Sequence, residues 1–149
     1  MARESDQRTL SRARRGARKL LVQALYQLQI GGSLWQDLYH QYLEDPDAAS
    51  ADAAFFREVL MQVAGGRESL DETLAKYSDI EPARLDPIEH GILWVALYEL
   101  LHRPDVPFRV VISEAVDLAK RFGATDGHKY VNGVLDRAAS ELRPHERDT

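Results

Sequence analysis

The chain has 149 residues, of which 44% are apolar and none is cysteine, and its formal net charge at pH 7 is −5. This length and apolar content suit one domain with its own hydrophobic core. The lack of cysteine excludes a disulfide framework and thiolate catalysis. The longest apolar run, GILWVALYELL, is too short for a membrane span and contains Glu99, and the N-terminus is charged where a signal peptide needs an apolar stretch. We therefore expect a soluble cytoplasmic protein.

The net charge conceals a strong asymmetry along the chain. Residues 1–20 hold seven Arg/Lys and two Asp/Glu, a net charge of +5, whereas the remainder holds 12 basic and 22 acidic residues, a net charge of −10. A basic segment on an acidic body indicates a polyanion partner, either nucleic acid or an anionic membrane surface, that is contacted by one end of the protein. The alternative interpretation is a disordered, solvated tail.

The basic segment opens the first predicted helix, which begins near Thr9 or Ser11 and ends at Gly31-Gly32. At about 100° per residue, alanine and leucine side chains gather on one face of this helix. The following residues gather on the opposite face: Arg12, Arg15, Arg18, Lys19 and Tyr26. Cations at the positive N-terminal end of a helix cost stability unless an anion neutralises them. This cost favours a polyanion ligand.

The second and third predicted helices follow directly. Ser33 is expected to cap the segment LWQDLYHQYLE, and the turn-rich loop EDPDAAS comes after it. Asp52 is expected to cap the third helix, which either ends at Gly65-Gly66 or is kinked there and resumes through RESLDETLAKYS. We favour the long bent helix.

Three more helices complete the predicted fold. The first of them has Asp86 at its N-cap, Pro87 at its first position and Pro104 beyond its end. Its apolar residues occupy all faces of the helix, as expected of a central helix that is surrounded by others. The next runs from Pro107 to Gly123, and the last is DGHKYVNGVLDRAASEL. Because no strand-like alternation bounded by hairpin turns occurs, the fold class is predicted to be all-α.

Patterns that carry enzymatic chemistry are missing from the sequence. It has no Walker phosphate loop, GxGxxG, GxSxG, HExxH or EF-hand pattern, and its histidines show no metal-ligand spacing. The neighbours Glu89/His90 and Asp126/His128 do not face each other on a helix, so we interpret them as surface or capping residues. The sequence predicts a protein that is not an enzyme and uses neither a metal nor a cofactor.

Candidate RNA-binding residues occur in the first and the last helix. The candidate cations of the first helix are Arg12, Arg14, Arg15, Arg18 and Lys19. They can neutralise phosphates in a salt-dependent way, and Tyr26 can stack on an unpaired base, a contact worth roughly 1–3 kcal/mol. Lys129 and Tyr130 form a second candidate contact, in which Tyr130 is either a stacking platform or a tyrosine at the core boundary. A basic helix also suits a membrane or an acidic protein.

Three long segments carry a family resemblance: RRGARKLLVQALYQ, ALYELLHRPDVPFRVVISEAVDLAKRFG and DGHKYVNGVLDR. In this order, from about Arg12 to Leu142, they resemble the transcription antitermination factor NusB family. The resemblance implies about seven helices in two roughly perpendicular bundles. It also implies binding of boxA-type single-stranded RNA of ribosomal RNA leaders together with the small-subunit ribosomal protein NusE, in an antitermination complex on RNA polymerase. A homodimer is compatible with the same resemblance.

The resemblance assigns functional residues in the first helix. The family's arginine-rich motif falls on Arg14, Arg15 and Arg18, and its RNA-contacting tyrosine falls on Tyr26. Gly16 stands where some members have a further arginine, which leaves the number of phosphate contacts open.

Further assignments fall in the second half of the chain. Tyr130 matches a family phenylalanine placed near RNA, so it keeps the ring and adds a hydroxyl. Glu89 matches a family glutamate linked to complex formation, and Asp126 matches the acidic residue shortly before the aromatic. We therefore expect Glu89 and Asp126 to serve partner-protein binding or complex formation.

The expected organisation is a flexible N-terminal extension at 1–11, one RNA-binding domain at 12–142 and a flexible tail at 143–149. The domain is expected to have subdomains of about 12–80 and 81–142. Two alternative functions remain: a NusB-like RNA-binding module in rRNA modification, and a protein-interaction scaffold that binds no RNA. The lack of a catalytic domain or a glycine-rich cofactor loop argues against a self-contained methyltransferase.

Overall fold

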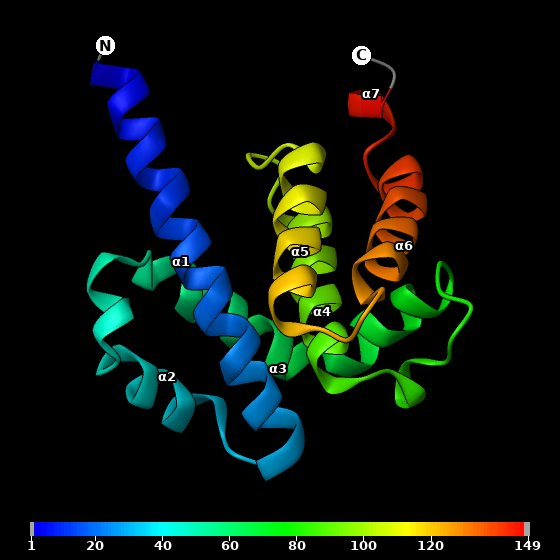
Figure 1. Cartoon of the computed structure of the whole chain (residues 1–149), viewed down its shortest axis with the longest axis horizontal. Helices are drawn as coiled ribbons and strands as arrows, with labels where there is room; N and C mark the ends of the chain where they lie inside the picture. Colours follow the sequence, from blue (N-terminus) through cyan, green and yellow to red (C-terminus); the bar gives the residue numbers. More distant parts are fainter. Residues whose placement is uncertain (1, 148–149) are drawn as a thin grey trace. The chain divides into compact units, whose positions relative to one another are not determined.

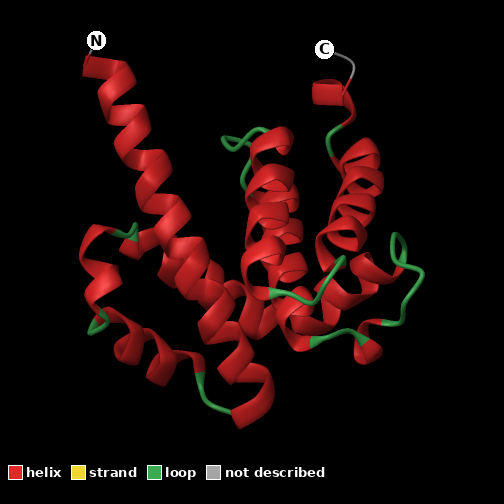
Figure 2. Ribbon diagram, in the orientation of Figure 1, coloured by secondary structure: helices red, strands yellow, loops and turns green. Residues whose placement is uncertain are grey.

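The computed structural model describes residues 2–147 and the side chains of residues 3–146. Within that range it has seven α-helices, two short 3-10 helices and no strand, which confirms the predicted all-α class (Figure 1; Figure 2). The α-helices are α1 (Ala2–Gly31), α2 (Trp35–Leu43), α3 (Ala53–Ala75), α4 (Pro87–His102), α5 (Phe108–Phe122), α6 (Gly127–Leu142) and α7 (Pro144–Arg147). The 3-10 helices are η1 (Pro46–Ser50) and η2 (Pro82–Arg84). Over these residues no helix combines the length and the apolar character that crossing a membrane requires.

The chain divides into two compact units, Met1–Gly65 (unit 1) and Gly66–Thr149 (unit 2). The division therefore lies at 65/66, whereas we expected it near residue 80. It falls inside α3, where Gly66 has a non-helical backbone with φ −122° and ψ 19°. The long bent helix that we favoured is confirmed, and its bend coincides with the division between the units.

Helix α1 of unit 1 begins earlier than predicted, at Ala2 rather than near Thr9 or Ser11. Residues 2–11, which we expected to be a flexible extension, therefore form the first turns of this helix. The hydroxyl of Thr9 donates to the carbonyl of Ser5 over 2.9 Å, so Thr9 lies inside the helix and does not cap it. Residues 2–11 contain neither glycine nor proline, and Glu4 lies in the first turn, where the helix dipole favours an anion. The predicted cost of placing cations at the helix end is consequently wrong, because the dipole effect fades within the first turn and Arg12 lies beyond it.

The segment that connects α2 and α3 is attached to α1. Asp52 caps α3 as predicted, by accepting a hydrogen bond of 3.0 Å from the backbone N–H of Phe55. The backbone N–H of Asp52 donates to the carbonyl of Ala13 over 2.9 Å. The predicted cap of α2 is wrong: the N-cap residue is Leu34, not Ser33, and it makes no side-chain cap bond.

Helix α4 is the buried centre of unit 2. Its N-terminus is as predicted, since Pro87 is its first residue and Asp86 Oδ1 accepts from the N–H of Ile88 over 2.8 Å. The helix packs against α5 and α6, and its residues from 89 to 100 are buried without a break. The predicted limits of α5 are also confirmed, with Pro107 as its N-cap and Gly123 as its C-cap.

A half-buried carboxylate, that of Asp71, attaches the second half of α3 to α4. Asp71 Oδ1 accepts from His90 Nε2 over 2.7 Å and from Trp94 Nε1 over 2.8 Å. The rings of His90 and Trp94 lie 4.1 Å apart between centroids. Our interpretation of His90 as a surface or capping residue is wrong, because this histidine is 7% exposed.

The expected flexible tail is wrong for Arg143, which is 8% exposed, and Pro144–Arg147 forms α7. The guanidinium of Arg143 donates at 2.8–3.0 Å to four carbonyls, those of Glu99, Leu100, Arg103 and Val106. It also pairs with the Glu146 carboxylate. Most of these carbonyls are at the C-terminal end of α4, where a helix leaves its last carbonyls unsatisfied and favours a cation. Residues 148–149 of the expected tail lie outside the described residues.

We predict that Arg143→Met lowers the free energy of unfolding by about 3 kcal/mol, because several buried carbonyls lose their donor at once. Urea denaturation followed by circular dichroism measures this loss. The matched control is Arg84→Met, which makes the same change at an exposed position. Equal stability of the two variants would contradict the role of Arg143 as the cap of α4.

Candidate nucleic-acid interface

Four of the predicted RNA-binding residues lie on one line along α1. From Arg12 the line passes to Arg15, Lys19 and Tyr26 in steps of three, four and seven residues. Each step is close to a whole number of helical turns, so the four side chains leave the helix in similar directions. Arg12 and Arg15 are exposed, and Tyr26 is 41% exposed. We call these four residues the α1 line.

Arg14 and Arg18 occupy a different face of α1. Arg18 is 3% exposed, and its guanidinium lies 5.2 Å from the centroid of the Phe55 ring. The Arg14 guanidinium lies 5.5 Å from the same centroid, and Arg14 Nε is 3.6 Å from Asp52 Oδ2. The prediction that Arg18 shares the exposed face is wrong, because Arg18 is rotated about 80° from the α1 line at 100° per residue. Guanidinium groups tolerate burial when they stack on an aromatic ring, and here both attach the start of α3 to α1.

Lys19 has an acidic neighbour from the loop that contains η1. Its Nζ lies 3.8 Å from Asp47 Oδ2, and the side chain of Asp47 is 64% exposed. An exposed ion pair of this kind contributes at most about 1 kcal/mol and is weakened by salt. A phosphate can therefore take the place of Asp47. Composition pointed to the acidic body of the protein but not to this local pairing, which arises because the loop folds back onto α1.

The cations of the α1 line repel one another. Arg12 and Arg15 are three residues apart, and Arg15 and Lys19 are four apart, so both pairs are neighbours on the helix surface. Each such pair of like charges destabilises a helix by about 0.2–0.5 kcal/mol. A bound polyanion removes this repulsion. The cost that favours a polyanion ligand therefore comes from repulsion between side chains rather than from the helix dipole.

The second candidate contact lies in unit 2, where Tyr130 is half-buried. Its hydroxyl and that of Ser78 share a hydrogen bond, and Ser78 Oγ accepts from the N–H of Ile80 over 3.0 Å. The hydroxyl that distinguishes this tyrosine from phenylalanine thus attaches α6 to the segment after α3. Our prediction did not include Ser78, because 52 residues of sequence separate it from Tyr130.

Lys129 and Asp126 form an exposed ion pair at the start of α6. Lys129 Nζ lies 3.2 Å from Asp126 Oδ1, and the side chains are 72% and 66% exposed. Asp126 has φ 67°, in the left-handed region that aspartate tolerates better than most residues. Its carboxylate makes no cap bond to α6 and is accessible to a partner.

Glu89 is buried, with 4% of its surface exposed, so our interpretation of it as a surface or capping residue is wrong. Its Oε1 accepts from the N–H of Ala124 over 2.9 Å. A Cβ built on Gly123 would lie 2.5 Å from this oxygen, and one built on Gly127 would lie closer still. The two glycines therefore allow the turn between α5 and α6 to close over the carboxylate, and Glu89 positions the backbone on both sides of Asp126.

The protonation of Glu89 is altered by its surroundings. Burial raises its pKa above the ordinary value of 4.5, the nearby Asp86 carboxyl raises it further, and the N–H of Ala124 lowers it. The second oxygen, Oε2, is buried and has no hydrogen-bond partner among the described residues. The folded protein therefore favours the protonated form more than the unfolded chain does.

The two sets of candidates belong to different units. The residues from Arg12 to Tyr26 lie in unit 1, whereas Glu89, Asp126, Lys129 and Tyr130 lie in unit 2. Within unit 2 these four residues are grouped at the α5–α6 turn and the first turn of α6, with Glu89 beneath the turn.

We predict that the unsubstituted protein loses stability relative to the Glu89→Gln variant as the pH rises above about 4.5. The quantity compared is the free energy of unfolding. A raised folded-state pKa means that the folded protein holds more protons in this window, so its stability decreases as they are released. Urea denaturation from pH 4 to pH 8 measures the difference. Glu89→Ala, which also loses the Ala124 bond, should cost about 1–3 kcal/mol at every pH. Parallel curves for the parent and Glu89→Gln would contradict the assignment.

Comparisons with known proteins agree with one another. A family model described as the NusB family matches residues 15–140. The transcription antitermination protein NusB of Shewanella halifaxensis is 45% identical over 130 residues, which are 87% of this chain and 96% of that protein. The solved structure of T. maritima NusB superposes with a TM-score of 0.79 at 29% identity, over 91% of this chain and 97% of that chain.

A second solved structure contains the antitermination factors NusB and NusE in complex with dsRNA. It matches with a TM-score of 0.74 at 25% identity, over 87% of this chain and 98% of that chain. The family model covers well over half of the sequence, and the Shewanella relative is similar over nearly its whole length. This chain belongs to the NusB family.

Proposed function

We propose that this protein is a non-catalytic transcription antitermination factor of the cytoplasm. It binds boxA-type RNA of ribosomal RNA leaders together with the small-subunit ribosomal protein NusE, and the pair joins the antitermination complex on RNA polymerase. The observation that carries this proposal is the α1 line, which places three cations and an exposed tyrosine in one row. Relatives named as antitermination proteins and a solved NusB–NusE complex with dsRNA support the same function.

The residues of the α1 line have distinct proposed roles. Arg12, Arg15 and Lys19 bind phosphates, which gives affinity that decreases as salt rises. Tyr26 stacks on an unpaired base, because its ring is accessible and a base offers an aromatic face whatever its sequence. Single-stranded RNA presents such bases more readily than a duplex does.

Arg14 and Arg18 have a supporting role in this proposal. Their stacking on Phe55 and the ion pair of Arg14 with Asp52 hold α1 against the start of α3. They orient the exposed cations instead of making the first phosphate contacts. The family's arginine-rich motif therefore divides here into Arg15, which faces solvent, and two arginines that stabilise the helix beneath it.

Residues of unit 2 form a second proposed contact, which belongs to a different unit from the α1 line. Tyr130 and Lys129 contact RNA, and Asp126 contacts a partner protein through its exposed carboxylate. Glu89 serves complex formation indirectly, by positioning the turn that carries Asp126. If RNA and NusE share part of this surface, each raises the affinity of the other by the same coupling free energy.

The proposed function is tested with a fluorescently labelled boxA-type RNA, a scrambled RNA and a duplex RNA. Anisotropy is measured at two salt concentrations with and without NusE, and sedimentation reports whether a homodimer forms. We expect preferential binding of the boxA-type RNA that weakens with salt and tightens with NusE. Equal binding of all three RNAs under every condition would contradict the proposal and favour the scaffold alternative.

The double variant Arg12→Ala with Arg15→Ala should weaken RNA binding about tenfold at low salt. It should also reduce the slope of log K against log salt by about 1.4, because each of the two lost phosphate contacts to a single strand contributes about 0.7. Binding to NusE should remain nearly unchanged. The control is Arg57→Ala, which removes a cation outside α1. An unchanged RNA affinity in the double variant would overturn the assignment of these two arginines.

Substitutions of Tyr26 test the contribution of base stacking separately from the contribution of charge. Tyr26→Ala should cost about 1–3 kcal/mol of RNA binding because the aromatic face is lost, whereas Tyr26→Phe should bind almost as the parent does. The salt slope should be the same for all three proteins, because no cation changes. Comparable losses in the two variants would show that the hydroxyl, not the ring, makes the contact.

A further inference from the structure

The row of cations on α1 continues beyond the segment shared with the family. Arg8 is exposed and lies four residues before Arg12, whereas the family model begins at residue 15. Arg8 also precedes Tyr26 by 18 residues, which is five full helical turns. Because α1 is one continuous helix from Ala2 to Gly31, Arg8 stands on the α1 line although the resemblance does not include it.

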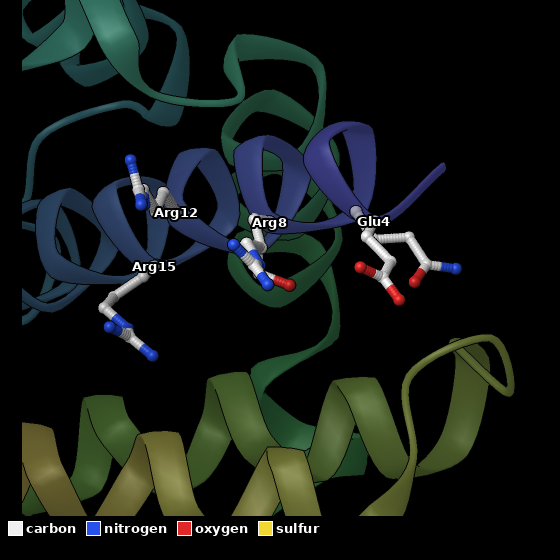
Figure 3. A pocket seen from close by; sticks show the side chains of 6 residues that line it. Glu4, Arg8, Arg12 and Arg15 are labelled. Atoms are coloured by element: carbon white, nitrogen blue, oxygen red, sulfur yellow. The ribbon is translucent and has the colours of Figure 1, made fainter. Parts of the chain in front are cut away.

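A hollow on the surface follows this end of the helix (Figure 3). Its volume is about 420 Å³, and its lining residues are Glu4, Gln7, Arg8, Ser11, Arg12 and Arg15. Figure 3 shows the four charged side chains projecting from successive turns of α1. The residues that line the hollow carry three guanidinium groups, one carboxamide, one hydroxyl and one carboxylate, and the carboxylate belongs to Glu4 at the N-terminal limit.

We propose that this hollow is a phosphate-binding extension of the RNA site, with Arg8 as its principal residue. The proposal rests on the proposed function and adds that the RNA footprint extends past the boxA-type element. Guanidinium groups bind phosphate through paired hydrogen bonds, and Gln7 and Ser11 offer neutral donors to phosphate oxygens. Glu4 repels phosphate and so marks the end of the extension.

Geometry favours a nucleic-acid strand over an acidic protein as the occupant. Arg8 is about 10 Å along the helix from Arg15 and about 27 Å from Tyr26, at 1.5 Å per residue. A nucleic-acid strand carries a phosphate every few ångströms, about 3.4 Å apart along a duplex axis, and can follow a straight row of cations over this length. The same strand then reaches Tyr26 for base stacking without changing face.

The test compares a boxA-type RNA with the same RNA lengthened by several unstructured nucleotides at its 5′ end or its 3′ end. The variant is Arg8→Ala, and the matched control is Arg3→Ala. Both arginines are exposed residues of α1 and carry the same charge, but Arg3 lies about 140° around the helix from Arg8 at 100° per residue. Alanine favours the helix at both positions, and circular dichroism checks that α1 is retained.

We expect the unsubstituted protein to bind the RNA lengthened at one end more tightly than the short RNA. For that lengthened RNA alone, Arg8→Ala should weaken binding about threefold and reduce the slope of log K against log salt by about 0.7. Arg3→Ala should bind every RNA as the parent does. Glu4→Gln should have the opposite effect and tighten binding of the lengthened RNA, because it removes the repelling carboxylate.

Equal effects of Arg8→Ala and Arg3→Ala would overturn the extension, as would a loss in Arg8→Ala that appears only in binding to NusE. If Arg15→Ala still weakens binding of the short RNA in that case, the proposed function stands and only the extension fails. If the parent shows no preference for boxA-type RNA, the proposed function fails, and the extension fails with it.

Discussion

The candidate interface depends on the 3.6-residue period of α1. Steps of three, four and seven residues return to the same face, which brings Arg12, Arg15, Lys19 and Tyr26 into one row. Arg14 and Arg18, four residues apart, fall together on another face, where the start of α3 is packed. One basic segment therefore has two functions, because the helix separates the cations that stabilise unit 1 from those that a ligand can reach.

Unit 2 relies on buried polar groups that complete the ends of its helices. Arg143 provides donors for the last carbonyls of α4, and Glu89 accepts from the turn that precedes α6. Such groups are costly when unpaired and stabilising when their hydrogen bonds are satisfied. Glu89 in this way fixes the position of the turn on which Asp126 is exposed.

The exposed charges of α1 and those at the start of α6 differ in their balance. The cations of the α1 line repel one another, and Asp47 makes a weak ion pair with Lys19 over 3.8 Å. A polyanion therefore gains affinity both from direct contacts and from relief of the repulsion. In unit 2 the exposed ion pair of Asp126 and Lys129 keeps the local net charge near zero.

The sequence by itself determined the helices whose ends have local signals, such as Asp86-Pro87 for α4 and Gly123 for α5, because capping and backbone restrictions act within about four residues. At Gly65-Gly66 it left open whether the helix ends or bends, and the structure shows the bend at Gly66. The helical period also placed Arg12, Arg15, Lys19 and Tyr26 on one face, although the predicted face included Arg18 as well. Only the tertiary structure decided that Arg18, Glu89 and Arg143 are buried. Their partners are remote in sequence, as with the 43 residues between Arg143 and Leu100, so no local pattern distinguishes a charged side chain that is packed inside from one that remains in solvent.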